Sequence, residues 1–176
     1  MPPAPADQVE GSFEALVREN QDMVYTTALR LLGREAEAED IAQETFLRAF
    51  ERRGDLLCGG NPGGWLRAVA RNLSLNHLER HRRRWRLFSE LAADGAGLED
   101  TLPADEERGR DDGRRLELAL LRLPEAQRVP LVLFHFEELS YEQISRRLGV
   151  SLGKVKTDIH RGRQALRGVL GDDDAR

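Results

Sequence analysis

One stretch near the C-terminal end of the chain, residues 141–160, constrains the fold more than any other. Ser145 is a small residue where two predicted helices touch, and Gly149 follows four positions later, at a turn that favours glycine because it needs a positive φ. Val150 and Val155 would fill the angle between the helices. Two helices joined in this way form a helix-turn-helix, which can place its second helix in the major groove of DNA.

The second of these helices has an outer face made of hydrogen-bonding and basic side chains. On a helix they share one side, at positions i, i+1, i+4, i+5 and i+8: Lys156, Thr157, His160, Arg161 and Gln164. The alternative is a helical hairpin with a solvated basic face. DNA binding is the better interpretation, because the glycine, the small residue and the basic face coincide in register.

Apolar residues at helical spacing predict an all-α protein, with no convincing strand. Ser12 would cap a first helix that stops at Gly33, and a second would run to about Arg53, with Phe50 in its buried stripe and Glu37 on its outer face. The remaining predicted segments are a glycine-rich loop over 54–64, a helix towards Arg86 with Asn61 as its N-cap and Pro62 as its first residue, and further helices over 116–123, 126–136, 140–148 and 151–170. Pro130 would lie in the first turns of the helix over 126–136, Ser140 and Gln143 would form a capping box, and Ser151 would cap the last helix.

These helices are expected to form two small domains, residues 12–87 and 114–170, joined by a flexible acidic linker over 88–113. The net charge of −4 hides two basic blocks, since residues 65–86 hold seven arginines and one acid, and residues 151–170 hold five basic side chains and one acid. A polyanion could therefore be bound at two separate places. The single cysteine, Cys58, excludes an internal disulfide, and no apolar stretch is long enough for a membrane span.

The predicted helix from Pro62 combines arginines with aromatic and amide side chains next to the glycine-rich loop. This combination suits unstacked bases, because base stacking on an aromatic ring is worth roughly 1–3 kcal/mol. The candidate residues are Trp65, Arg71, Asn72, Asn76 and Arg80. The alternatives are that Trp65 is a core residue and that the arginine run is a solvated helix end or a nonspecific phosphate patch.

Three strings of the sequence resemble a bacterial extracytoplasmic-function (ECF) sigma factor of the sigma-70 family. EAEDIAQETFLRAF (37–50) and GGWLRAVARNLSLNHLERHRRR (63–84) resemble the family's region 2. LRLPEAQRVPLVLFHFEELSYEQISRRLGVSLGKVKTDIHRGRQALR (121–167) resembles its region 4. The strings follow the family's order and cover both predicted domains.

The resemblance implies an alternative sigma factor that directs promoter-specific initiation by bacterial RNA polymerase. The single cysteine makes a reducing cytoplasm the expected location. Asp40, Gln43 and Glu44 would bind the clamp helices of the polymerase β′ subunit, and the second domain would contact the β flap. The −10 element would be captured by Trp65, Arg71, Asn72, Asn76 and Arg80, and the −35 element read by Lys154, Lys156, Thr157, His160, Arg161 and Arg163. An anti-sigma factor, in some cases membrane-bound, is the other implied partner, and no small-molecule substrate is implied.

Some residues depart from the family pattern. Asp158 stands where a basic residue is usual, and its charge is expected to repel a phosphate. Asn76 replaces a commonly acidic residue, and Gly162 replaces an alanine at a cost of about 0.5–1 kcal/mol in a helix interior.

His77 and His81 have the i, i+4 spacing of zinc ligands, and Cys58 is a further candidate ligand. No other ligand pair accompanies these three residues, so no metal or cofactor is predicted.

Two other classes of protein compete with this hypothesis. An autonomous helix-turn-helix regulator would explain residues 114–170 but would leave Asp40–Glu44 and the basic third helix without a role. A helical adaptor that binds only proteins would show no DNA crosslinking. The sequence holds no nucleophile–base pair or phosphate loop, so we do not expect an enzyme.

Overall fold

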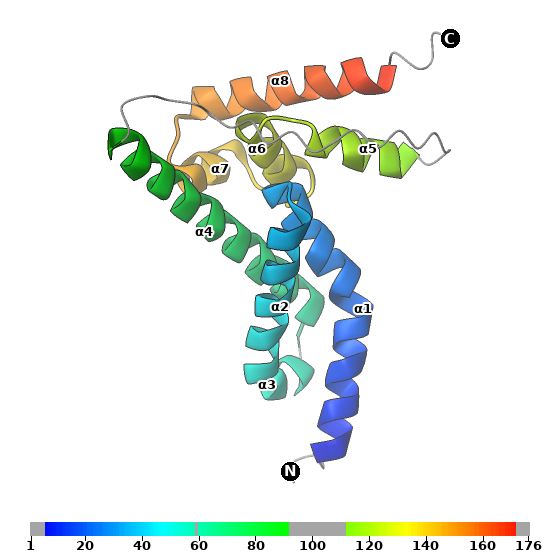
Figure 1. Cartoon of the computed structure of the whole chain (residues 1–176). Helices are drawn as coiled ribbons and strands as arrows, with labels where there is room; N and C mark the ends of the chain where they lie inside the picture. Colours follow the sequence, from blue (N-terminus) through cyan, green and yellow to red (C-terminus); the bar gives the residue numbers. More distant parts are fainter. Residues whose placement is uncertain (1–5, 59, 92–111, 172–176) are drawn as a thin grey trace. The chain divides into compact units, whose positions relative to one another are not determined.

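The computed structural model describes residues 6–58, 60–91 and 112–171. These residues form α-helices joined by short turns (Figure 1). The helices are α1 (Ala6–Leu32), α2 (Glu35–Glu51), α3 (Arg53–Cys58), α4 (Pro62–Leu91), α5 (Asp112–Leu121), α6 (Glu125–His135), α7 (Tyr141–Leu148) and α8 (Leu152–Gly171). No strand occurs in these three ranges, which confirms the predicted all-α class. Among the described residues, no helix is long and apolar enough to cross a bilayer.

The chain divides into two compact units, Met1–Gly95 and Ala96–Arg176. Most of the predicted linker, residues 92–111, lies outside the described part of the chain. In unit 1, helices α1, α2 and α4 pack together (Figure 1). The core cluster consists of Leu16, Val24, Ala49, Leu66 and Ala70.

Two buried hydroxyl groups of unit 1 are hydrogen-bonded within their own helices. The hydroxyl of Thr45 donates to the carbonyl of Ile41 at 2.7 Å, and that of Ser74 donates to the carbonyl of Ala70 at 2.8 Å. Because each bond stays within its own helix, a small polar side chain can be fully buried between helices.

Unit 1 differs from the sequence prediction at its helix boundaries. Helix α1 begins at Ala6, so Ser12 lies inside the helix and is not its N-cap. The predicted loop over 54–64 contains α3, whose Leu56 and Leu57 pack against the core cluster. Tertiary packing thus outweighs the low helix propensity of this glycine-containing segment.

Two side chains of α2 also differ from their predicted positions. Phe50 was expected in the buried stripe but is 43% exposed, with its ring edge-on to Phe13 at 5.3 Å and under the guanidinium of Arg53 at 4.1 Å. Glu37 was expected on the outer face but is half-buried. It accepts a hydrogen bond from Arg34 at 3.0 Å, and its other carboxylate oxygen lies 3.4 Å from His77 on α4.

Unit 2 is built from α5–α8, and α6 and α8 make its main packing contact (Figure 1). Its buried residues include Leu120, Val129, Leu133, Ile144 and Ile159. Pro130 lies inside α6, within two turns of its start, as the sequence indicated. The guanidinium of Arg128 is buried and donates to the carbonyl of Leu123 at 3.0 Å, which ties α6 to the end of α5.

Gly162 allows α8 to lie close to α6. A Cβ atom at this buried position would lie 2.8 Å from Cδ1 of Leu131 and 3.5 Å from the carbonyl oxygen of Gln127. The helix-propensity cost that the sequence suggested for this glycine is therefore accompanied by a packing requirement. A larger side chain would have to displace the buried side chain of Leu131.

We expect Gly162→Val to lower the free energy of unfolding of unit 2 by about 1–3 kcal/mol, because the added atoms overpack a filled core. Gly168→Val is the matched control, since a Cβ atom there meets nothing within 4 Å. Urea unfolding of both variants, followed by circular dichroism, measures the difference. Equal stability of the two variants would contradict the packing role of Gly162.

Candidate nucleic-acid interface

The helix-turn-helix is formed by α7 and α8. Ser140 and Gln143 cap α7 reciprocally: the Ser140 hydroxyl accepts from the Gln143 amide at 3.2 Å, and the Gln143 side chain accepts from the Ser140 amide at 2.8 Å. Gly149 ends α7 with φ 64°, the left-handed backbone that its sequence position predicted. The hydroxyl of Ser145 donates to the carbonyl of Val150 at 2.6 Å, which fixes the turn to the helix before it.

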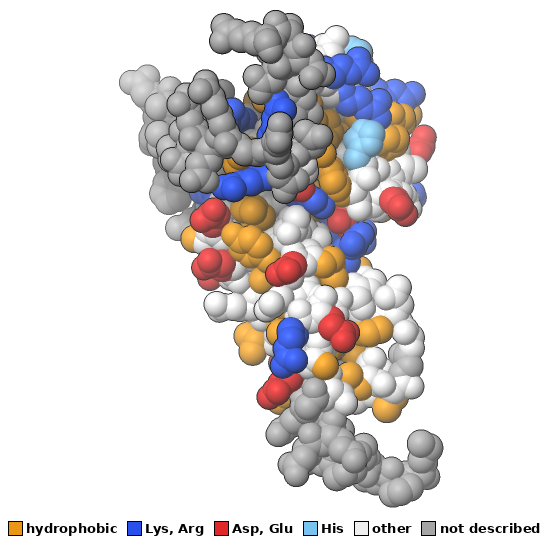
Figure 2. Space-filling model, turned by 90° about the vertical axis from the view of Figure 1, so that its right-hand side faces the viewer, with side chains coloured by type: hydrophobic (Ala, Val, Ile, Leu, Met, Phe, Trp, Pro, Cys, Tyr) orange, Lys and Arg blue, Asp and Glu red, His pale blue; other side chains and the backbone are white. Residues whose placement is uncertain are grey.

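Helix α8 begins with a second cap and then presents its basic face. Ser151 accepts a hydrogen bond from the amide of Lys154 at 3.2 Å, as predicted. The inner side of α8 buries Val155 and Ile159. The predicted outer residues are all exposed: Lys156, Thr157, His160, Arg161 and Gln164. Lys and Arg side chains gather beside a histidine in the upper part of Figure 2, where α8 lies.

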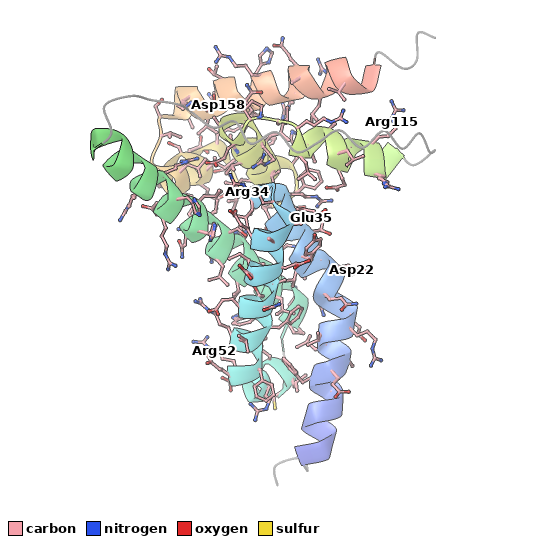
Figure 3. All side chains as sticks on the ribbon, viewed as in Figure 1. Asp22, Arg34, Glu35, Arg52, Arg115 and Asp158 are labelled. Atoms are coloured by element: carbon pink, nitrogen blue, oxygen red, sulfur yellow. The ribbon has the colours of Figure 1, made fainter. Side chains whose placement is uncertain are left out.

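Asp158 lies on the inner side of α8 and not on the basic face (Figure 3). It is 7% exposed, and its carboxylate binds the ammonium of Lys154 at 2.8 Å. The expected repulsion of a phosphate by Asp158 is therefore wrong, because the charge is buried and paired within the helix. Lys154 is half-exposed but already holds this partner.

Arg163 is anchored inside unit 2. Its Nε donates to Nε2 of His135 at 3.0 Å, and its guanidinium lies 5.4 Å from the centre of the Phe134 ring. Burial, and to a smaller degree the charge of Arg163, lowers the pKa of His135, which favours the neutral imidazole that can accept this bond. Phe134 stacks on Tyr141 at 4.7 Å, so this cluster joins α6, α7 and α8.

The exposed side of α4 carries a second polar stripe. Asn72, Asn76 and Arg80 are exposed at i, i+4 and i+8, which is one face of the helix. Arg71 is half-buried on a different side of α4, so the structure does not place it with the other three. Trp65 is partly buried and packs against the core cluster of unit 1, so it has part of the core role that the sequence left as an alternative.

The turn before α4 sets the position of its first residues. The side-chain oxygen of Asn61 accepts from the amide of Gly64 at 2.8 Å, which is the predicted N-cap. A Cβ atom at Gly64 would lie 2.7 Å from Nδ2 of the Asn61 side chain. A side chain at this position would therefore have to displace the Asn61 side chain that caps α4 before Trp65.

The outward face of α2 joins acidic and apolar side chains. Asp40 and Gln43 are exposed, and Glu44 forms an ion pair with Arg48 at 2.8 Å. Leu47 continues this face at i+7 from Asp40 and is 62% exposed. Leu47 is not among the predicted site residues, although an apolar side chain outside the predicted buried stripe of α2 indicates an exposed apolar position.

Comparison with known proteins gives matches over both units. Residues 16–84 match the family model described as sigma-70 region 2, and residues 113–166 match the model for sigma-70 region 4. The chain is 41% identical over 162 residues to the ECF RNA polymerase sigma factor SigE of Mycolicibacterium smegmatis, covering 90% of this chain and 62% of SigE. It is 34% identical over 170 residues to the ECF RNA polymerase sigma factor SigW of Bacillus subtilis, covering 93% of this chain and 91% of SigW.

A solved structure has a similar fold. The sigma factor RpoE of Bartonella quintana, crystallised with the anti-sigma factor NepR, matches with a TM-score of 0.55 and 24% identity. The match covers 91% of this chain and 97% of that chain.

Proposed function

Because this chain belongs to the ECF sigma factors of the sigma-70 family, we propose that it is the dissociable subunit that directs promoter-specific transcription initiation by bacterial RNA polymerase. Its role is recognition of polymerase and promoter, with no catalytic centre of its own. Since it acts on RNA polymerase, its place of action is the cytoplasm.

The outward face of α2 is the proposed surface for core polymerase, at the clamp helices of β′. Its acidic and amide side chains, Asp40, Gln43 and Glu44, lie on the same side of α2 as the exposed apolar side chain of Leu47, three to seven residues before it. An apolar centre with a polar rim is the usual anatomy of a protein interface. A large exposed leucine that the fold of unit 1 does not need supports this assignment.

The polar stripe of α4 is the proposed surface for unstacked bases of the −10 element. Asn72 and Asn76 can hydrogen-bond base edges, and Arg80 can bind the backbone. Trp65 is fixed by the core at the start of the same helix, where its exposed part can stack on a base. Arg71 is half-buried, so we propose that it assists binding of the −10 element from outside the exposed stripe.

The exposed face of α8 is the proposed reader of the −35 duplex. Lys156, Thr157, His160 and Arg161 project from the second helix of a helix-turn-helix, the helix that enters the major groove. Lys154 and Arg163 lie beside this face, and each is held by a partner within unit 2. Because these partners restrict both side chains, we propose that they contact DNA phosphates and not base edges. Unit 2 also contacts the β flap in this proposal.

The two units act as linked binding modules, residues 12–87 and 114–170, joined through residues 88–113. Once one unit is bound, the second binding event is intramolecular, which raises the overall affinity without new contacts. An anti-sigma factor is a further proposed partner, membrane-bound in one form of the hypothesis. The support is that a protein of this fold, RpoE of Bartonella quintana, was crystallised with one.

The observation that carries the proposal is the presence of two separate recognition surfaces on one chain, the exposed basic face of α8 and the polar stripe of α4. The direct test is run-off transcription of fragmented genomic DNA by core polymerase with and without the purified chain. We expect new transcripts whose start sites share two conserved blocks at a fixed spacing upstream. Specific binding of the chain to duplex DNA without polymerase, with no new transcripts, would instead identify an autonomous regulator.

A further inference from the structure

Helices α2 and α4 of unit 1 bring together three side chains with metal-binding atoms. They are Glu37 on α2 and His77 and His81 on α4, and one ligand atom from each lies within 4.8 Å of the other two. All three residues are half-buried. We infer that this cluster binds a Zn²⁺ ion.

One distance in the cluster matches that of a tetrahedral zinc site, and the other ligand atoms lie within 4.8 Å of one another. Nε2 of His77 lies 3.4 Å from Oε2 of Glu37. Two ligands on one tetrahedral ion, with bonds of 2.0–2.2 Å, are separated by about 3.4 Å. The rings of His77 and His81 are one helical turn apart, with centroids at 4.8 Å, and this i, i+4 spacing is the one that lets two histidines share a zinc ion.

The glutamate is already held in a ligand-like orientation. Arg34, which lies at the start of α2 (Figure 3), donates to Oε1 of Glu37 at 3.0 Å. The other oxygen, Oε2, is the one directed at His77. A hydrogen bond to a metal-binding carboxylate from a neighbouring side chain is the usual way in which such a ligand is oriented.

The contact of His77 with Glu37 is an ion-pair contact without a hydrogen bond. Nε2 of His77 is enclosed, yet it makes no hydrogen bond to any described residue, although Glu37 is close. A buried nitrogen without a hydrogen-bond partner is rare in a folded protein. A metal ion between the two groups would satisfy it.

The donor set selects the kind of ion. Two imidazoles and one carboxylate suit Zn²⁺ and similar transition metals, whereas Mg²⁺ and Ca²⁺ prefer oxygen ligands. Three protein ligands at a partly exposed site leave a fourth position for water. The ion would link α2 to α4 beside Asn76 and Arg80, and would stabilise the packing of these two helices.

The test is a titration of the untagged, chelator-treated full-length chain with Zn²⁺, in competition with a chromophoric chelator. We expect one equivalent of Zn²⁺ to bind at micromolar concentrations, without competition from excess Mg²⁺, and to raise the unfolding temperature. Co²⁺ in place of Zn²⁺ should give the visible absorption of a tetrahedral ion. The inference is independent of the proposed function, because only the isolated chain is used.

Two double variants, each of which removes two histidines, locate the binding site. His77→Ala/His81→Ala should abolish the stoichiometric binding, and Glu37→Gln should weaken it by at least about tenfold. His135→Ala/His160→Ala, which removes the two histidines of unit 2, should bind Zn²⁺ as tightly as the unaltered chain does. No binding by the unaltered chain at micromolar Zn²⁺, or equal binding by the His77→Ala/His81→Ala variant, would overturn the inference.

Discussion

Replacing Leu47 by glutamate should weaken binding of the chain to core RNA polymerase by about a hundredfold or more. Full burial of a leucine contributes about 1.5–3 kcal/mol, and a carboxylate in its place would have to be desolvated without a partner. Every 1.4 kcal/mol is a tenfold change in affinity. The side chain is 62% exposed in the free chain, so the unfolding temperature of unit 1 should be close to that of the unaltered chain.

Titration of labelled core polymerase with each variant measures this effect. Val169→Glu is the matched control, because it places the same charge on an exposed apolar position, 46% exposed, that lies outside the proposed surfaces. An equal loss of affinity in both variants would mean that added negative charge, and not the α2 face, weakens the complex. Unchanged binding by Leu47→Glu would remove α2 from the interface.

The second large effect is expected on the basic face of α8. The Lys156→Ala/Arg161→Ala variant should bind a −35 duplex, as part of the polymerase complex, about a hundredfold more weakly. A base-contacting arginine is worth about 1–3 kcal/mol, and loss of a phosphate contact reduces the salt slope by about 1. Core binding through the α2 face should be unchanged, because both side chains lie on the exposed face of α8 that we assign to the −35 duplex.

Fluorescence anisotropy with promoter DNA at several salt concentrations measures both quantities. Arg114→Ala/Arg122→Ala removes two positive charges from the same unit, outside the α8 face, and serves as the control. If this control loses as much affinity as the α8 variant, unit 2 attracts DNA only through its overall charge. If the α8 variant binds the −35 duplex more weakly but binds a scrambled sequence as well as the unaltered chain does, the two residues read bases.

The helix-turn-helix could be predicted in detail because its signals are local. Ser140 and Gln143 are three residues apart, and Ser145 and the turn at Gly149 are four residues apart, so each signal acts over about one helical turn. The cap and the left-handed glycine have their predicted geometry. The same holds for the Asn61 cap of α4. Capping and turn residues specify backbone geometry without help from distant parts of the chain.

The errors occur where packing between distant segments decides the outcome. Helix α3 forms because Leu56 and Leu57 reach the core cluster of unit 1, which no local pattern indicates. Asp158 is an acidic residue in a basic helix, but its helical position turns it inward, where Lys154 neutralises it. Sequence position alone does not tell an exposed charge from a buried, paired one.

The pairing of Glu37 with the two histidines of α4 is a further case. The sequence shows His77 and His81 one turn apart, but the third ligand atom comes from α2 and is brought in by the packing of the two helices. Cys58, the third residue that the sequence suggested, does not belong to this cluster. Pairs of helices that meet in space can assemble a site that no linear spacing predicts.

The measurement that tests the central claim most directly is binding of the purified chain to bacterial core RNA polymerase, with an Asp40→Ala/Glu44→Ala variant beside it. A sigma factor should form a one-to-one complex at nanomolar concentrations, and removal of the two carboxylates should weaken that complex because they form the rim of the α2 face. Absence of a complex, with a preparation that circular dichroism shows to be helical, would contradict the assignment of this chain as a polymerase subunit.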